Sequence, residues 1–468
     1  PHEFLKSMTL AFRPSGSAPF TAFNEVIRGV NAPCPDGLKA NVIDLRKKSE
    51  CEYLFLNSPT FKNINTLAMQ TKVKRILSGL SSFCESANLD RTKYLARPQD
   101  FTRQRILTFN KLCLFLLSQA KRSLSIELTV YFDNWGQSPC TKGAFSKARY
   151  RILWPFFLDW HRYFVALIYS EIRSLRKWKG FYLKAIDGTS IYLFKDEEVA
   201  KVFGGQANQH LRVPMARAGL ELDVLNGYCT QVQLQAHWKG EVVFAEGFLE
   251  DSRPEDLRIY DRNFAGYRLI SKHLQKNIHF LMRCTVGFNQ VVKEFVASEK
   301  KQAIVAFCIP KNEVIAVRQK GQVVNAKETL QVRLLRIDIG QAEPEILITN
   351  LLDLRKYPHS CFKELYNYRW GDETRFDQIK NKLQIEVFSG HKPQAIYQDF
   401  FATIITSNIH NLICEACAQK LEQINATKET TVAINQNVSI GLLKPQLINL
   451  FITQNPRTVF DQLKELFL

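Results

Sequence analysis

The most informative polar residues of this 468-residue chain lie together between Tyr366 and Lys380. If this segment is a helix, Tyr366, Arg369, Glu373 and Lys380 fall at about 0°, 300°, 340° and 320° around its axis. The apolar residues of the segment occupy about 220–320°, so the polar group borders the side that would pack on the core. A solvated helix face would carry its charges opposite the apolar stripe. The pattern therefore suggests a half-buried site for a metal ion and phosphates, with a solvated face carrying i,i+4 ion pairs as the alternative.

Two aspartates elsewhere end apolar runs that are predicted to be strands. Asp187 ends the first strand of a predicted hairpin over 181–194, whose turn would be Gly188-Thr189. Asp261 ends a second apolar run, and Arg253–Asp256 is expected to form the first turn of a short helix before it. Each aspartate could instead serve a local turn or helix cap. Two strand-end aspartates and a glutamate on a packed helix can bring three carboxylates to one place. Such a group can bind the two Mg²⁺ ions that catalyse phosphoryl transfer.

The middle of the chain predicts a mixed sheet. Residues 218–225 and 228–236 are expected to form a hairpin joined by Asn226-Gly227, which is the strongest two-residue hairpin signal. Residues 269–350 mostly alternate between apolar and polar side chains, which indicates a β-rich block. Helices are expected on both sides of this region, over about 60–134, over 395–421 and in the last 40 or so residues.

The net charge of +18, from 63 Lys and Arg against 45 Asp and Glu, indicates a polyanionic partner, most often nucleic acid. A basic, hydroxyl-rich segment before residue 152 predicts a helix capped by Thr141 or Ser146. Its residues Lys147, Arg149 and Arg151 are candidate phosphate contacts.

The eleven cysteines lack regular spacing, which indicates a reducing compartment with free thiols. Cys414 and Cys417 are more typical of a helix core than of a zinc site, because no second pair accompanies them. The most apolar run, 152–169, contains charged residues and is not expected to span a membrane.

The spacing of Tyr366, Arg369, Glu373 and Lys380 is that of the Tyr-x2-Arg-x3-Glu-x6-Lys signature of bacterial insertion-sequence transposases of the cut-and-paste DDE type. The chain resembles this family over about residues 140–415. Further matching segments are 186–189 around the first Asp, 261–264 around the second, and 381–390 after the Glu. Asn263 stands where the family usually has Gly, and Asp372 where it usually has an apolar residue.

The resemblance implies an α/β fold: a ribonuclease H-like catalytic domain, with a mixed sheet and flanking helices, interrupted by a β-strand insertion and joined to helical N- and C-terminal regions. The expected parts are 1–55, poorly defined; 56–178, helical, basic and DNA-binding; 179–268, the first part of the catalytic domain; 269–358, the β-rich insertion; 359–415, the second catalytic part with the Glu helix; and 416–468, a helical region for dimerisation.

The resemblance also implies the role of each site residue. Asp187, Asp261 and Glu373 would be the catalytic residues and hold two Mg²⁺ ions, for which Mn²⁺ can substitute. Tyr366, Arg369 and Lys380 would grip DNA phosphates near the cleaved end. In relatives that excise through a DNA hairpin, an aromatic of the insertion stacks on a flipped base. Trp238 lies outside the insertion, and the aromatics considered within it are Phe280, Phe288 and Phe307.

The resemblance implies a DNA transposase that binds double-stranded DNA, both the terminal inverted repeats and the target, and acts as a homodimer in the cytoplasm of a bacterium, at the nucleoid. Two alternatives are a non-catalytic DNA-binding protein derived from a transposase and a Mg²⁺-dependent nuclease without strand transfer.

Overall fold

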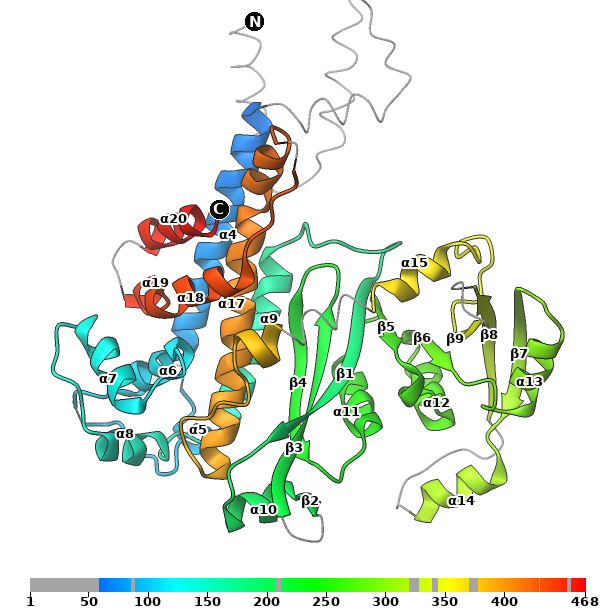
Figure 1. Ribbon diagram of the computed structural model, residues 1–468, viewed down its shortest axis with the longest axis horizontal. Helices are drawn as coiled ribbons and strands as arrows, with labels where there is room; N and C mark the ends of the chain where they lie inside the picture. The colour runs from blue at the N-terminus through cyan, green and yellow to red at the C-terminus, as the bar shows by residue number, and fades with distance from the viewer. Residues whose placement is uncertain are drawn as a thin grey trace, which may run out of the picture. The chain divides into compact units, whose positions relative to one another are not determined.

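A computed structural model of the chain describes residues 59–85, 89–103, 105–207, 212–319, 328–338, 344–369, 378–428, 430–452 and 456–468. The strands are β1 (Tyr182–Tyr192), β2 (Gly205–Ala207), β3 (Arg212–Asp223), β4 (Tyr228–Ala236), β5 (Asp256–Tyr260), β6 (His279–Cys284), β7 (Gln302–Cys308), β8 (Thr329–Ile337) and β9 (Glu345–Thr349). Helices precede, interrupt and follow them (Figure 1).

The helices before the sheet are α4 (Pro59–Phe83), α5 (Arg91–Tyr94), α6 (Phe109–Ser118), α7 (Leu124–Asp133), α8 (Lys142–Arg149) and α9 (Pro155–Glu171). Those between strands are α10 (Glu197–Phe203), α11 (Glu241–Phe248), α12 (Tyr267–Gln275), α13 (Gln290–Ala297) and α14 (Lys311–Gln319), with short 3-10 turns η1 (Leu249–Asp251) and η2 (Arg262–Phe264). After the sheet come α15 (Cys361–Asn367), the π-helical η3 (Gln378–Lys382), α17 (Pro393–Asn425), α18 (Gln436–Gln446), α19 (Asn449–Ile452) and α20 (Pro456–Phe467).

The nine strands form one mixed sheet in the order β2-β3-β1-β5-β6-β9-β8-β7, with β4 also pairing with β3. At its centre β4, β3 and β1 are antiparallel neighbours, whereas β1, β5 and β6 run parallel. This strand order and these directions are those of a ribonuclease H-like core. The expected α/β fold class is confirmed.

The predicted turn at Gly188-Thr189 is wrong, because β1 continues without a break from Tyr182 to Tyr192. Gly188 is needed for close packing rather than for a turn. A Cβ atom on this residue would lie 2.8 Å from Cζ of Phe244 and 2.9 Å from Oε1 of Glu241, both on α11. The turn is predicted from a glycine, but a glycine within a strand also occurs where another segment packs closely against the backbone.

The second hairpin is confirmed. Strands β3 and β4 pair from Ala216 with Ala236 to Asp223 with Tyr228, and Gly227 in the connection has a φ of 74°. The short helix expected to begin at Arg253 is also wrong. Asp256 accepts a hydrogen bond from the Arg253 amide at 2.9 Å and begins β5, a fully buried strand whose inner position between β1 and β6 overrides the local helix signal.

The block 269–350 contains four strands, as expected, together with the helices α12, α13 and α14. Strand β6 is part of the central parallel set, and β9 pairs with it antiparallel from Leu281 with Thr349 to Cys284 with Ile346. The strands of this block therefore extend the central sheet instead of forming a separate sheet, and the assignment of 269–358 to an insertion stays a prediction.

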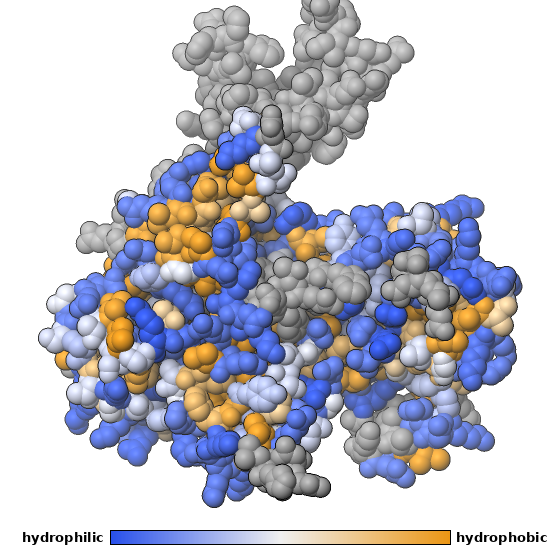
Figure 2. All heavy atoms as spheres, in the orientation of Figure 1, coloured by the Kyte–Doolittle hydropathy of each residue, from blue (hydrophilic) through white to orange (hydrophobic). Residues whose placement is uncertain are grey.

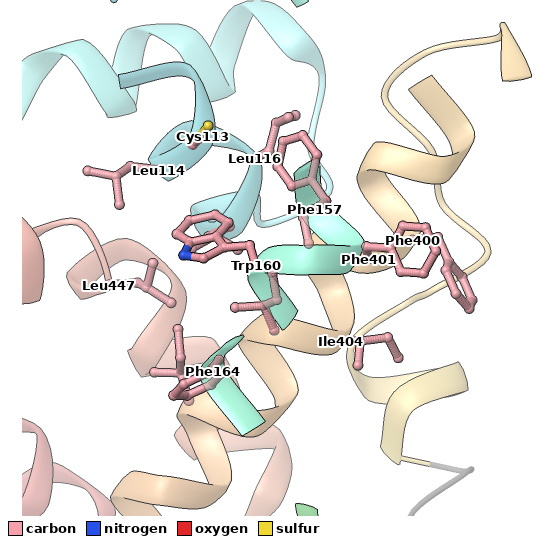
Figure 3. Packing of buried hydrophobic residues seen from close by; sticks show 14 of the residues in the cluster. Cys113, Leu114, Leu116, Phe157, Trp160, Phe164, Phe400, Phe401, Ile404 and Leu447 are labelled. Atoms are coloured by element: carbon pink, nitrogen blue, oxygen red, sulfur yellow. The ribbon is translucent and has the colours of Figure 1, made fainter. Parts of the chain in front are cut away.

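The helices before β1 share a hydrophobic core with α17 and with the outer face of β3 and β4. Figure 3 shows Phe157 and Trp160 of α9 among residues of α6 and α17, including Leu116, Phe401 and Ile404. The indole of Trp160 also donates a hydrogen bond to the Leu80 carbonyl at 2.9 Å. In the described ranges, no helix combines the length and the apolar character that crossing a bilayer requires.

Candidate active site

Asp187 lies in the middle of the central strand β1, opposite Leu220 of β3. Strand alternation places its side chain on the same face as Leu183 and Ala185. Leu183 packs there against Phe362 and Leu365 of α15. The carboxylate is half-buried and accepts a hydrogen bond from the Gly188 amide at 2.7 Å.

Asp261 follows the last residue of β5, the parallel neighbour of β1. Ile186 is registered with Tyr260, so Asp187 and Asp261 occupy the next position on each strand. Asp261 sits at the N-cap position of η2, but its side chain makes no capping hydrogen bond. The carboxylate is thus available for another partner, which argues against the alternative of a helix cap.

Tyr366 and Arg369 reach the same face of the sheet from α15 and the turn that follows it. The Arg369 guanidinium lies 5.9 Å from the centre of the Tyr366 ring, and its amide bonds the Tyr366 carbonyl at 3.0 Å. The Tyr366 side chain is 2% exposed, and its buried hydroxyl has no hydrogen-bond partner among the described residues. The phenol is thus buried beside Arg369 in this conformation, and its contact with a DNA phosphate stays a prediction.

The charges at this site are coupled. Burial, reinforced by the carboxylates of Glu241 and Asp261, raises the pKa of Asp187 to about 6, while the Gly188 amide and Arg369 oppose the shift. Burial also raises the pKa of Tyr366, with Asp261 adding to the shift and Arg369 opposing it. These pKa shifts indicate that the side chains of Asp187, Asp261, Tyr366 and Arg369 lie close enough to affect one another's charge. A cation bound there would relieve the repulsion among the carboxylates.

Glu241 is a fourth acid near this neighbourhood that the sequence did not reveal. It is the first residue of α11, and its carboxylate accepts a hydrogen bond from Arg217 of β3 at 2.9 Å. The same carboxylate overlies Gly188, the residue after Asp187. No motif marks Glu241, since the approach of α11 to β1 is what brings it to the site.

Glu373 and Asp372 lie outside the described residues, as does most of the segment expected to be one helix from Tyr366 to Lys380. In the described part, α15 ends at Asn367 and the chain resumes in η3. Lys380 of η3 lies 3.6 Å from Glu386. Within the described ranges, His, Cys, Asp and Glu side chains form no group of three that could hold a metal ion.

The prediction that Arg149 contacts DNA is wrong. Its side chain is 1% exposed and forms an ion pair with Asp399 of α17 at 2.6 Å, with further hydrogen bonds to Ser389 and Gln398. The guanidinium connects α8 to α17 and is inaccessible to a phosphate.

For the other two basic candidates, Lys147 and Arg151, contact with DNA stays a prediction. Thr141 caps α8 by accepting a hydrogen bond from the Ala144 amide, as one of the two proposed caps required. Lys147 is exposed on the same helix, and Arg151 is half-buried, 3.5 Å from Asp100.

Two of the three insertion aromatics are buried, Phe280 at 0% and Phe307 at 7% exposure. Phe288 is half-buried and stacks on Tyr267 with ring centres 4.9 Å apart. Phe288 follows β6 and Tyr267 follows Asp261, so both lie beyond the carboxyl ends of parallel strands. Phe288 is therefore the candidate on which a base could stack.

Comparison with protein families matches residues 178–409 to the model described as the transposase DDE domain. This chain contains a transposase DDE domain. By that domain it belongs to the DDE transposases, a family of DNA phosphoryl-transfer enzymes that generally use divalent metal ions. The matched range begins just before β1 and ends within α17, so it contains Asp187, Asp261 and the signature from Tyr366 to Lys380.

Among solved structures, the chain is similar to the piggyBac transposase in a cryo-EM structure of its synaptic complex with hairpin DNA. The two share 11% sequence identity, and the match covers 86% of this chain and 85% of the other, with a TM-score of 0.38. Comparison with curated proteins gives no match.

Proposed function

We propose that this transposase binds the terminal inverted repeats of an insertion sequence and catalyses Mg²⁺-dependent strand cleavage and strand transfer by a cut-and-paste route. The observation that carries the proposal is the pair Asp187 and Asp261, which occupy the same level of the adjacent parallel strands β1 and β5, on the face covered by α15. Local structure does not account for either carboxylate. Strand β1 has no turn at Asp187, and the Asp261 side chain does not cap η2.

Asp187, Asp261 and Glu373 are the residues we assign to two Mg²⁺ ions, or Mn²⁺ in their place. The raised pKa of Asp187 supports the assignment, because burial and the carboxylates of Glu241 and Asp261 disfavour its charge and a bound cation would offset both effects. When bound, the two ions supply activation of the attacking oxygen and stabilisation of the leaving oxygen in an in-line displacement at phosphorus.

Arg369 and Lys380 are assigned to DNA phosphates near the cleaved bond. Arg369 is half-buried beside the carboxylates and can orient a phosphate by paired N–H groups, whereas Lys380 acts as a point charge. Tyr366, beneath the guanidinium, limits the positions that Arg369 can take. Lys147 and Arg151 are assigned to DNA bound by the helical region 56–178, and the net charge of +18 supports a DNA partner.

We also propose that the protein acts as a homodimer through the C-terminal region 416–468. Val438 of α18 and Leu466 of α20 are each 53% exposed, and Figure 2 shows apolar side chains gathered around α17 and α20. An exposed apolar surface of this kind is typical of a surface that another chain covers.

The proposal is tested with Asp187→Ala, Asp261→Ala and Glu373→Ala on DNA carrying the element's inverted-repeat ends. Each variant should lose Mg²⁺-dependent cleavage while retaining end binding, since none of the three acids is assigned to affinity. Cleavage by Glu373→Ala would reject its assignment, and end binding without cleavage by the unaltered protein would favour the non-catalytic alternative. Supplying ends with a free 3′-OH and finding no joined product would favour a nuclease.

A further inference from the structure

The two most exposed large apolar side chains among the described residues lie at one end of the sheet. Trp238 is 65% exposed and follows β4, while Tyr192 is 58% exposed and ends β1. Tyr192 is registered with Met215 of β3, and the Met215 amide donates a hydrogen bond to the carbonyl of Gly204. Figure 1 shows β3 meeting α10 and β2 at this end.

Trp238 is held in place rather than free to turn. A Cβ atom on Gly204 would lie 2.4 Å from Cε3 of the indole, so the ring rests on the glycine backbone, whose φ is +75°. The His237 amide bonds the Phe203 carbonyl at 2.7 Å, and the Lys239 amide bonds the Ala236 carbonyl at 3.0 Å. The loop thus presents a pre-positioned aromatic surface to solvent, which lowers the entropy lost when a ligand stacks on it.

The charges around the indole favour an anionic partner. Lys195, Lys201 and Lys239 are exposed and have no ion pair with any described residue. The nearby acids are mostly neutralised, because Asp196 and Glu198 pair with Lys392 and Glu241 pairs with Arg217, which leaves Glu197 exposed. An aromatic surface flanked by unpaired lysines is the combination that binds single-stranded nucleic acid.

The surface is within reach of a strand held at the catalytic site. The level of Asp187 in the sheet is that of Val232 on β4, four residues before Ala236. At ~3.3 Å per residue and ~4.8 Å between strands, this places the end of β4 about 13 Å along the strand and about 10 Å across the sheet from Asp187, comparable to a few nucleotides. The chain then returns, so that Glu241, three residues after Trp238, overlies Gly188.

We propose that Trp238, at the same end of the sheet as Tyr192, is a stacking platform for unpaired bases of the DNA strand that leaves the catalytic site. The inference rests on the proposed function, since it takes the DNA to be held at Asp187 and Asp261. An intact duplex is the poorer ligand, because its base faces are already stacked on each other and an aromatic ring gains little from its phosphates.

The experiment compares two DNA probes, a blunt duplex of the repeat end and the same duplex with a short single-stranded flank. Trp238→Ala should bind the flanked probe ~5- to 150-fold more weakly than the unaltered protein, and bind the blunt probe equally well. Trp238→Phe should retain most of the affinity for the flank because the ring remains. Ile315→Ala, which removes a 56% exposed apolar side chain from α14, serves as the control and should leave both affinities unchanged.

A second measurement does not depend on how well the variants fold. 5-Iododeoxyuridine in the flank should crosslink on irradiation to Trp238 or Tyr192, as mapped by mass spectrometry. Two outcomes would overturn the inference: crosslinks confined to other residues, or a Trp238→Ala variant that binds the flanked probe as tightly as the unaltered protein does. If the unaltered protein still cleaves repeat ends, the proposed function stands in either case. If the unaltered protein binds neither probe, the inference and the proposed function both fail.

Discussion

Asp187 and Asp261 stand side by side at the centre of the sheet, each one residue beyond the registered pair Ile186 and Tyr260. Adjacent strands are about 4.8 Å apart, so two carboxylates on the same face of neighbouring strands repel each other when both are ionised. Burial, with Glu241 and Asp261 adding to it, raises the pKa of Asp187 to about 6, above the ordinary value of 3.8.

The first prediction concerns stability without metal. Because the native-state pKa of Asp187 is raised, the native state holds more protons than the unfolded state between about pH 4 and pH 6, and this group lowers the free energy of unfolding as pH rises through that window. Asp187→Asn should therefore stabilise the metal-free protein at pH 7.5 by on the order of 1–2 kcal/mol, with no gain near pH 4. Urea unfolding in EDTA measures this, and equal stability at pH 7.5 would contradict it.

The second prediction concerns Glu241. Its carboxylate raises the pKa of Asp187, so Glu241→Gln should lower that pKa. Since Asp187 must be ionised to hold a cation, the acid limb of Mg²⁺-dependent cleavage should move to lower pH. Glu250→Gln, at a 63% exposed position paired with Lys276, is the control and should leave the profile in place. An unmoved limb in Glu241→Gln would show that this acid does not act on Asp187.

The third prediction concerns Gly188. A methyl group there would meet the rigid ring of Phe244, so Gly188→Ala should lower the free energy of unfolding by ~1–3 kcal/mol. Gly287→Ala is the matched control, because a Cβ atom at Gly287 would have nothing within 4 Å. If adding Phe244→Leu restores the stability of Gly188→Ala, the clash with the ring is the cause. Thermal or urea unfolding of Gly188→Ala, Gly287→Ala, Phe244→Leu and the double variant decides.

The fourth prediction separates two basic residues of α8. Arg149→Ala leaves Asp399 buried without its partner and should destabilise the protein by ~3–5 kcal/mol. Lys147→Ala, at an exposed position, should leave the unfolding transition unchanged but weaken DNA binding and reduce its dependence on salt concentration. A stable Arg149→Ala protein with weakened DNA binding would reverse our assignment of the two residues.

The sequence predicts those parts of the fold whose cause is local. Asn226-Gly227 lies in the connection between β3 and β4 as expected, although that connection has four residues, 224–227, and not two; Gly227 provides its positive φ of 74°. Asp261 is placed correctly because it ends an apolar run, and parallel strands carry polar groups where they end.

The failures have causes that lie far away in the chain. Gly188 resembles a turn residue until α11 is known to pack on it, and Arg149 resembles a surface cation until Asp399, 250 positions later, is known to face it. Glu241 could not be recognised for the same reason, since its effect on Asp187 depends on the packing of α11 against β1. Fixed-spacing motifs find residues that act along one segment, and they miss those that another segment brings into place.

The pairing of β9 with β6 restricts how this protein can change during evolution. The ladder from Leu281 to Cys284 covers the hydrogen-bonding edge of β6, which would otherwise be an exposed template for aggregation. Changes in the length of the segments that carry α13 and α14 leave this ladder intact, whereas removal of β9 would expose that edge.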